Sequence, residues 1–206
     1  MARPGGRTAR VRSAVLTAAG DALIERGLPG IDLADLARRA GVGKTTVYRR
    51  WGTVAAVVAD LVDDMIETSA PRARTGTLDG DLLANADLVR RTLADPRQGR
   101  LFTALIGAAA ADERTTAALR GFYDARTAVW EPCVDDAVRR GELPGDTDAA
   151  SVVRAVSAPL YNLLLTRGVA PGPADARRAA AAAAAAARAG VFHASPGPEV
   201  PGGTSP

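Results

Sequence analysis

The sequence predicts an all-α protein with a small basic head and a larger helical body. Apolar residues recur every three or four positions in successive segments, which is the period of an amphipathic helix, and Gly or Pro interrupts the pattern between segments. No segment alternates apolar and polar residues as a half-buried strand would, and no internal repeat is present. The 206 residues are enough for one large or two small domains.

Three helices are expected near the N-terminus, after an arm at residues 1–9 that is rich in Arg, Gly and Pro. Gly27 ends the first helix, because glycine adopts the left-handed conformation that commonly follows a helix. Asp32 is expected to cap the second helix, since its short side chain can accept from a backbone amide. Gly41 ends that second helix. The three expected helices cover residues 10–26, 33–40 and 44–51.

The helical body follows this head. Thr53 is expected to cap the fourth helix, and Pro96 to separate two later ones. Pro132 and Pro159 lie inside predicted helices, where proline removes a donor. Pro132 is expected to kink its helix, and Pro159 to kink or break its own. The helices are expected over 54–68, 79–95, 97–111, 113–140, 148–167 and 174–189. The predicted domains are a flexible basic arm at 1–9, the head at 10–67, the body at 68–190 and a disordered tail at 191–206.

Charge is distributed unevenly along the chain. Residues 1–53 hold 10 Lys or Arg against 4 Asp or Glu, whereas the formal charge of the whole chain is only +3. A basic N-terminal third on a mildly acidic body indicates a polyanionic partner for that third alone. Aromatic residues make up 4% of the chain and apolar residues 47%, so the core must be built mostly from Ala, Leu and Val.

The scarcity of Cys and His, which often act in catalysis and metal binding, argues against several classes of protein. Cys133 and His193 are the only Cys and His, so no intramolecular disulfide can form and a His/Cys metal site lacks ligands. No convergent catalytic set is visible, so we expect no enzyme, no metal and no cofactor. The N-terminus lacks an apolar signal segment and no run of large apolar residues is long enough to span a bilayer. We therefore expect a cytoplasmic protein without membrane contact.

The stretch AGVGKTTVYRRW, residues 40–51, poses the main functional question, because GVGKTT is similar to the end of a phosphate-binding loop. Such a loop needs a glycine at position 38 and a buried strand before it. The chain has Arg38 there, and the apolar residues before it have helical spacing. A nucleotide site is therefore not expected.

A helix, a glycine-containing turn and a short helix together match the helix-turn-helix pattern. Val42 is expected to fill the gap between the two helices, and Val47 and Trp51 to face inward one turn apart. The other side chains of the third helix suit a DNA groove, because hydroxyls donate to phosphates while Lys and Arg bind phosphates or guanine edges. These candidate DNA-binding residues are Lys44, Thr45, Thr46, Tyr48, Arg49 and Arg50.

The segment IDLADLARRAGVGKTTVYRRW, residues 31–51, resembles the signature of TetR-family transcriptional regulators, and the preceding ERGLPGI is similar to the same domain. The resemblance covers about residues 10–67 and implies a head whose third helix enters the major groove. It further implies that Lys44, Thr45 and Arg49 approach bases. Thr46, Tyr48 and Arg50 would mainly touch the sugar-phosphate backbone. Family members often have Lys near the start of the fourth helix, where this chain has Val54. A phosphate contact there would come from backbone amides or be absent.

Dimerisation is expected through the two C-terminal helices, which form a four-helix bundle in TetR relatives. The helix over 148–167 is apolar around more than half of its circumference, and the Ala-rich run over 179–187 lets another helix approach closely. Packing of both helices within one subunit is the alternative. The candidate interface residues are Val152, Val156, Leu160, Leu163, Leu164, Ala182 and Ala186.

The middle helices are expected to enclose a pocket for a small apolar effector, as they do in TetR relatives. Aromatic side chains with a few polar groups suit such a ligand, although each one is also needed for the core. Phe102 and Trp130 are the leading candidates, with Tyr123 or Asp124 as a source of polarity. The candidate pocket residues are Phe102, Leu105, Ile106, Phe122, Tyr123 and Trp130.

These features together predict a DNA-binding transcriptional regulator. We expect a homodimeric repressor that binds a palindromic site in double-stranded DNA. A small-molecule effector would release it by moving the fourth helix and thereby changing the separation of the two recognition helices. The alternative is a helical protein-interaction module without sequence-specific DNA binding.

Overall fold

The computed structural model describes residues 6–68 and 71–193, and within these ranges the chain is all-α, as predicted. Apart from a single bridge between Thr147 and His193, no β-structure is present in the described ranges. One 3-10 turn, η1, covers Leu28–Gly30. The helices are α1 Arg7–Arg26, α2 Leu33–Arg39, α3 Lys44–Trp51, α4 Val54–Glu67, α5 Leu78–Ala94, α6 Pro96–Ala109, α7 Glu113–Arg139, α8 Ala149–Arg167 and α9 Pro173–Arg188.

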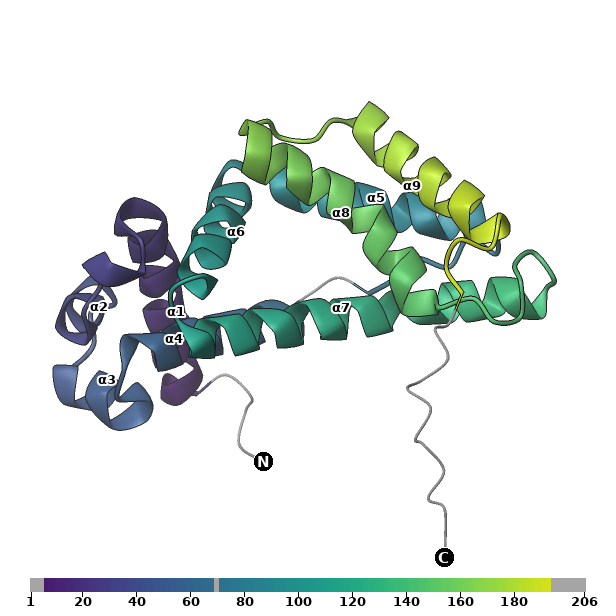
Figure 1. Cartoon of the computed structure of the whole chain (residues 1–206). Helices are drawn as coiled ribbons and strands as arrows, with labels where there is room; N and C mark the ends of the chain where they lie inside the picture. The colour runs from purple at the N-terminus through teal and green to yellow at the C-terminus, as the bar shows by residue number, and fades with distance from the viewer. Residues whose placement is uncertain (1–5, 69–70, 194–206) are drawn as a thin grey trace, which may run out of the picture.

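The helices form a head of α1 to α3 and a body of α5 to α9, with α4 joining the two (Figure 1). In the head, α2 and α3 pack on each other, and α1 packs on α4 and α6. In the body, α4 lies along α7, and α5 packs against both α8 and α9. Helix α4 links head and body because it packs on α1 and on α7, and α6 forms a second link through its packing on α1.

The helix starts follow ordinary capping chemistry. The side chain of Asp32 accepts from the backbone amide of Asp35, and that of Thr53 accepts from the amide of Ala56. Both predicted caps are therefore confirmed. Asp148 caps α8 in the same way, by accepting from the amide of Ser151. Such caps satisfy amide groups that have no partner within the helix.

Both ends of the chain differ from the prediction where the structure describes them. Helix α1 begins at Arg7, so residues 7–9 are helical and do not belong to the predicted arm. Residues 191–193 are likewise not part of a loose tail, because the amide of Asp148 donates to the carbonyl of Phe192 at 2.7 Å. The rest of the predicted arm, residues 1–5, and of the predicted tail, residues 194–206, lies outside the described residues.

The two internal prolines do not break their helices, so the break that was one of the two outcomes predicted at Pro159 does not occur. Pro132 lies inside the continuous helix α7 and Pro159 inside the continuous helix α8. A proline removes only one hydrogen bond from a helix, and packing on either side can hold the remaining turns together.

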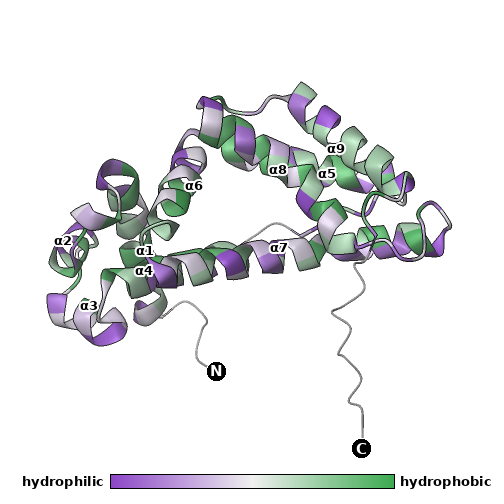
Figure 2. Cartoon of the chain, viewed as in Figure 1, coloured by the Kyte–Doolittle hydropathy of each residue, from purple (hydrophilic) through white to green (hydrophobic). Residues whose placement is uncertain are grey.

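The core consists mostly of Leu, Val and Ala, as the composition predicts. Figure 2 shows hydrophobic residues along α4, α5 and α8, and hydrophilic residues on α3. Cys133 is completely buried in this core, and burial raises the pKa of its thiol to about 12. The thiol is therefore protonated at neutral pH and fills space in the core.

Candidate DNA-binding surface and effector cavity

The turn between α2 and α3 is fixed by its backbone. Gly41 has a φ of 65°, a conformation that favours glycine. The amide of Val42 donates to the carbonyl of Ala37 at 2.9 Å, and the amide of Gly41 donates to the carbonyl of Arg38 at 3.2 Å. These two bonds form a Schellman motif, which ends α2 and sets the direction of α3.

One face of α3 is anchored in the head. Val47 is 0% exposed and Trp51, one turn later, packs partly buried against the core. The indole Nε1 of Trp51 donates to Oδ2 of Asp60 on α4 at 2.8 Å. The inward positions predicted for Val47 and Trp51 are therefore confirmed, and α3 is held at a defined orientation.

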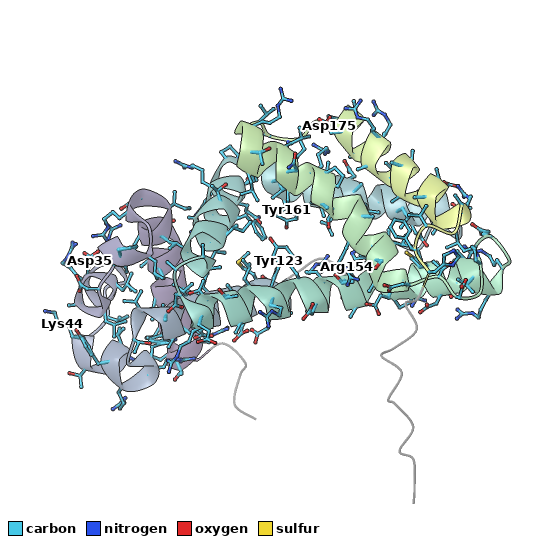
Figure 3. The ribbon with its side chains drawn as sticks, viewed as in Figure 1. Asp35, Lys44, Tyr123, Arg154, Tyr161 and Asp175 are labelled. Atoms are coloured by element: carbon cyan, nitrogen blue, oxygen red, sulfur yellow. The ribbon has the colours of Figure 1, made fainter. Side chains whose placement is uncertain are left out.

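The opposite side of α3 is open to solvent. We use "the outer face of α3" for its exposed residues; Thr46, the remaining candidate, is half-buried beside them. Tyr48 is 51% exposed, which is unusual for a large aromatic residue without a partner. Figure 3 shows Lys44 extending away from the head. The outer face comprises Lys44, Thr45, Tyr48, Arg49 and Arg50.

The arginines of α2 differ from the cations of α3 in their partners. Asp35 accepts from Arg26 and Arg38, and from Nε of Arg39 at 2.9 Å. The hydrogen bonds from Arg26, and then from Arg38 and Arg39, lower the pKa of Asp35 to about 2. Arg26, Arg38 and Arg39 are thus each paired with a carboxylate within the head.

Lys44 and Arg49, by contrast, form no ion pair with any residue that the structure describes. The guanidinium of Arg50 lies 4.9 Å from the centre of the Trp51 ring, so it is stacked rather than paired with a carboxylate. Exposed cations that form no ion pair create a positive surface potential, which attracts a polyanion.

An ion-pair network ties α4 to the first helix. Arg12 on α1 donates from Nε to Oδ1 of Asp60 at 2.9 Å and from Nη1 to Oδ1 of Asp64 at 2.7 Å. It also reaches Oε2 of Glu67 at 3.2 Å. Burial alone would raise the pKa of Asp60, but the hydrogen bonds from Arg12 and Trp51 outweigh it and the pKa is lowered. Asp60 therefore stays ionised and connects α1, α3 and α4.

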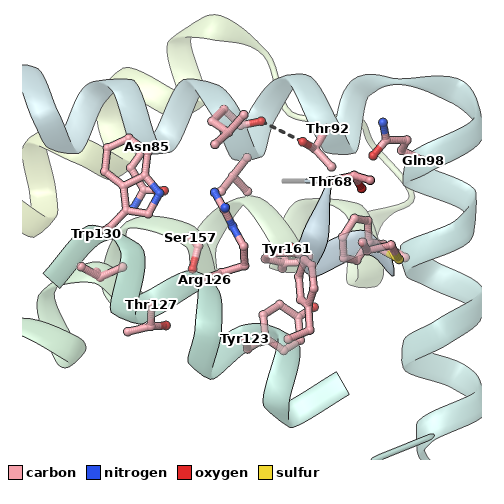
Figure 4. Close-up of a pocket in the computed structure, with 16 residues that line it drawn as sticks. Thr68, Asn85, Thr92, Gln98, Tyr123, Arg126, Thr127, Trp130, Ser157 and Tyr161 are labelled. Atoms are coloured by element: carbon pink, nitrogen blue, oxygen red, sulfur yellow. Dashed lines mark hydrogen bonds between the residues drawn. The ribbon is translucent and has the colours of Figure 1, made fainter. Parts of the chain in front are cut away.

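A cavity of about 350 Å³ lies in the body, between α4, α5, α6, α7 and α8 (Figure 4). Its size falls within the range of small-molecule sites. The C-terminal end of α4 contributes Met65 and Thr68 to its wall, so the helix that supports the head also touches the cavity. The other lining residues are Asn85, Leu88, Val89, Thr92, Gln98, Phe102, Phe122, Tyr123, Arg126, Thr127, Trp130, Val153, Ser157 and Tyr161.

Four of the six predicted pocket residues line this cavity: Phe102, Phe122, Tyr123 and Trp130. The prediction for Leu105 and Ile106 is wrong. Leu105 is 0% exposed in the core and Ile106 is half-buried away from the cavity. The cavity reaches only the first two turns of α6, at Gln98 and Phe102, whereas both residues lie about one turn further along the helix.

Tyr161 and Arg126 also line the cavity, although neither is among the predicted pocket residues. Tyr161 lies with its ring centre 5.9 Å from that of Phe102 and 5.5 Å from that of Tyr123. An aromatic phenol among the aliphatic residues of this helix was the available signal for Tyr161. Arg126 lies one turn before Trp130 on α7, so helical spacing from a predicted residue could have found it. Asp124, proposed as a source of polarity, is exposed and does not line the cavity.

Burial controls the protonation of the two tyrosines. It raises the pKa of Tyr123 to about 12 and that of Tyr161 well above its usual value. Both phenols therefore remain neutral at physiological pH. Figure 3 shows the two side chains extending into the space between α7 and α8. Across the described part of the chain, no group of three or more His, Cys, Asp or Glu residues is placed to hold a metal ion.

The candidate dimer residues divide into two groups. Val152, Val156 and Leu160 are 0% exposed because α5, α7 and α9 cover them within the chain, so the prediction that they form an interface is wrong. Ala182 is exposed, and the other candidates, Leu163, Leu164 and Ala186, are half-buried. The apolar residues that α8 exposes instead are Ala158, Pro159 and Leu165.

Helix α8 is also long and apolar enough to cross a membrane by length and composition. Only four of its 19 residues are buried within the chain. Core helices of soluble proteins can meet the same composition criterion, and α8 packs on α5, α7 and α9. Contacts within one subunit thus cover only part of the apolar surface of α8.

Comparisons with known proteins identify both halves of the chain. Residues 15–61 match the family model described as "Bacterial regulatory proteins, tetR family", and residues 72–183 match "Tetracyclin repressor-like, C-terminal domain". The Bacillus subtilis HTH-type transcriptional regulator YdeS is 30% identical over 156 residues, which cover 75% of this chain and 78% of YdeS. The DNA-binding transcriptional repressor TetR of Mycobacteroides abscessus is 30% identical over 79% of this chain and 84% of its own length.

Solved structures agree with these sequence relationships. The crystal structure of the TetR family transcription regulator SCO0332 superposes with a TM-score of 0.64 at 28% identity, covering 85% of this chain and 97% of that protein. Proteins of this kind are DNA-binding regulators and are generally not enzymes. The two matched halves and the full-length relatives show that the chain belongs to the TetR family of transcriptional regulators.

Proposed function

We propose that the protein is a dimeric, cytoplasmic repressor whose binding to a two-fold operator is released when a small molecule enters the cavity. The observation that carries this proposal is the position of α4. Its Asp60 holds Arg12 and Trp51 of the head, while its Met65 and Thr68 form part of the cavity wall. The name of the related repressor from Mycobacteroides abscessus supports repression rather than activation.

The outer face of α3 is the surface that we assign to DNA. Lys44, Thr45 and Arg49 are exposed at positions from which they can reach base edges in the major groove. Thr46, Tyr48 and Arg50 would contact the sugar-phosphate backbone and fix the register of the head. Val54 is half-buried at the start of α4, so any phosphate contact there comes from the backbone amides of that helix.

A dimer is supported by what α8 and α9 leave uncovered. Ala158, Pro159 and Leu165 of α8 are exposed, as is Ala182 of α9. A mostly apolar helix that exposes part of its apolar surface is typical of an interface, and two-fold pairing is the commonest arrangement. Two heads related in this way can read half-sites about 34–36 Å apart.

Coupling between ligand and DNA would run through α4. A ligand against Met65 and Thr68 displaces the C-terminal end of α4, and the bonds from Asp60 to Arg12 and Trp51 carry that displacement to α1 and α3. The effector shifts the equilibrium only if it binds the released spacing of the heads better than the DNA-bound spacing.

The DNA-binding part is tested by fluorescence anisotropy with the full chain and labelled duplexes that tile the promoter next to its own gene. We expect one duplex to bind about a thousandfold or more tighter than scrambled DNA, which is the lower range for specific regulators. Equal affinity for every duplex would contradict the proposal.

The dimer is tested by light scattering on a matched pair of variants. Leu165→Glu places a charge on the exposed face of α8 and should give monomers that bind the operator weakly. Leu83→Glu is the control, because Leu83 on α5 is 39% exposed, almost the same as the 40% of Leu165. Equal effects of the two substitutions would contradict an interface on α8.

A further inference from the structure

We infer that the effector of this protein carries a carboxylate or a comparable anionic oxygen group on an apolar body. The inference rests on the proposed role of the cavity and names the chemical class of its ligand. It departs from the apolar effector that the composition predicts.

Two buried donors on the cavity wall have no partner within the described residues. The indole Nε1 of Trp130 and the amide Nδ2 of Asn85 are both buried and unbonded, and the two residues are only 2% and 4% exposed. A buried donor without a partner costs free energy that a native structure rarely leaves uncompensated. Both residues line the cavity, so a ligand oxygen there would satisfy them.

The single formal charge on the cavity wall is positive. Arg126 belongs to the lining, whereas none of the 16 lining residues is Asp or Glu. Arg126 and Trp130 are four residues apart on α7, so both side chains lie on the same face of that helix. Figure 4 shows the Arg126 side chain extending from α7 toward α5, with Trp130 and Asn85 also at the cavity wall.

Burial strengthens the interaction that the Arg126 guanidinium can form with an anion. It lowers the pKa of Arg126 from its usual value, although arginine remains protonated at any physiological pH. A partly desolvated guanidinium forms stronger bonds with an anionic oxygen than a solvated one does. Phe102, Phe122 and Val153 line the cavity as well, and they match an apolar body.

The test uses three probes with one aromatic body and different charge: 2-naphthoate, 2-naphthalenemethanol and 2-naphthylmethylammonium. Calorimetric titration of the full chain without DNA should give the tightest binding for 2-naphthoate, about tenfold or more tighter than the neutral alcohol. The ammonium probe should bind most weakly. Binding of the alcohol as tight as that of the naphthoate, or no binding of any probe, would overturn the inference.

Variants assign the preference to named groups. Arg126→Met should weaken 2-naphthoate about tenfold while leaving the alcohol unchanged, and Arg126→Lys should retain the preference. Trp130→Phe keeps a ring but removes the unbonded donor, and should weaken 2-naphthoate about threefold or more. Arg120→Met is the control, because Arg120 is an exposed arginine on the same helix.

Unchanged binding of the alcohol shows that a variant still has an intact cavity. An equal loss for all three probes in Arg126→Met would mean a structural role for Arg126 and would overturn the inference. Release of operator DNA is measured separately by anisotropy. If 2-naphthoate binds with the expected preference but releases no DNA, the proposed coupling fails while the ligand class stands.

Discussion

The outer face of α3 and the wall of the cavity both present hydrogen-bond donors and positive charge, but in opposite surroundings. On α3, Lys44 and Arg49 are exposed. In the cavity, Asn85 and Trp130 are buried and Arg126 is partly desolvated. Exposed charges act over a distance of about 8–10 Å and are screened by salt, whereas buried donors act only on the group that touches them. Under the proposed function, attraction to a long polyanion and recognition of a small molecule occur at two separate surfaces.

Salt should separate the two surfaces most strongly. Between 50 and 200 mM salt, operator affinity should fall about a thousandfold or more, if each head neutralises several phosphates. The affinity of the cavity for 2-naphthoate should change by less than about threefold, because enclosed charges are screened less. Parallel titrations by anisotropy and calorimetry measure both. A similar salt dependence at the two sites would contradict the distinction.

Arg49→Ala should have the next largest effect. Removing a cation that reaches a base edge costs about 1–3 kcal/mol, which is about 5- to 150-fold in affinity, and relaxes base preference at one position. Arg38→Ala is the matched control, because Arg38 is exposed in the same head but already bound to Asp35. Anisotropy with the operator and single-base variants measures both. Equal losses of operator affinity for the two substitutions would show that pairing with a carboxylate does not determine which arginines bind DNA.

Asp60→Asn tests the connection between the two regions. It removes the charge that holds Arg12 and Trp51, and should lower the free energy of unfolding by about 1–3 kcal/mol. Chemical denaturation measures this change. Asp64→Asn should cost less, because the side chain of Asp64 is 36% exposed against 22% for Asp60. A larger effect at Asp64 would place the main anchor nearer the cavity.

The smallest expected effect is a loss of stability in acid that comes from protonation of Asp35. Its pKa is about 2 in the folded chain, below the ordinary value of 3.8, so its contribution to stability is present above about pH 4. That contribution is lost as the pH falls from about 4 to 2. The melting temperature of Asp35→Asn should therefore be lower than that of the native chain at pH 6, with a difference that shrinks toward pH 2. A constant difference across this range would mean that the Asp35 charge is not responsible.

The helix bounds and the inward-facing residues of the head could be predicted almost completely from the sequence, because each depends on residues only a few positions away. Asp32 and Thr53 cap helices through amides three residues away, and Gly41 lies where only the neighbouring turn matters. Val47 lies on the single apolar stripe of a short helix, so its burial needs no knowledge of the body.

Burial and the cavity lining in the body could not be predicted from the sequence, because they depend on contacts between segments that are far apart in the chain. Helix α8 is apolar on most sides, and only its neighbours decide that Val156 is buried while Leu165 is exposed. Likewise, helical spacing places Phe102 and Ile106 on one face of α6, but the extent of the cavity is fixed by α5, α7 and α8. Asn85 and Arg126 come from separate helices, and nothing in either segment alone marks them as neighbours of one cavity.

Complete enclosure of Cys133 has a practical consequence for following this protein in solution. It is the only thiol in the chain, and a buried thiol with a pKa of about 12 does not react with maleimides at neutral pH. A cysteine introduced at the exposed position Arg38 would then be the single reactive site per subunit. A spin label there would report the distance between the two heads of a dimer directly, with the native cysteine left in place.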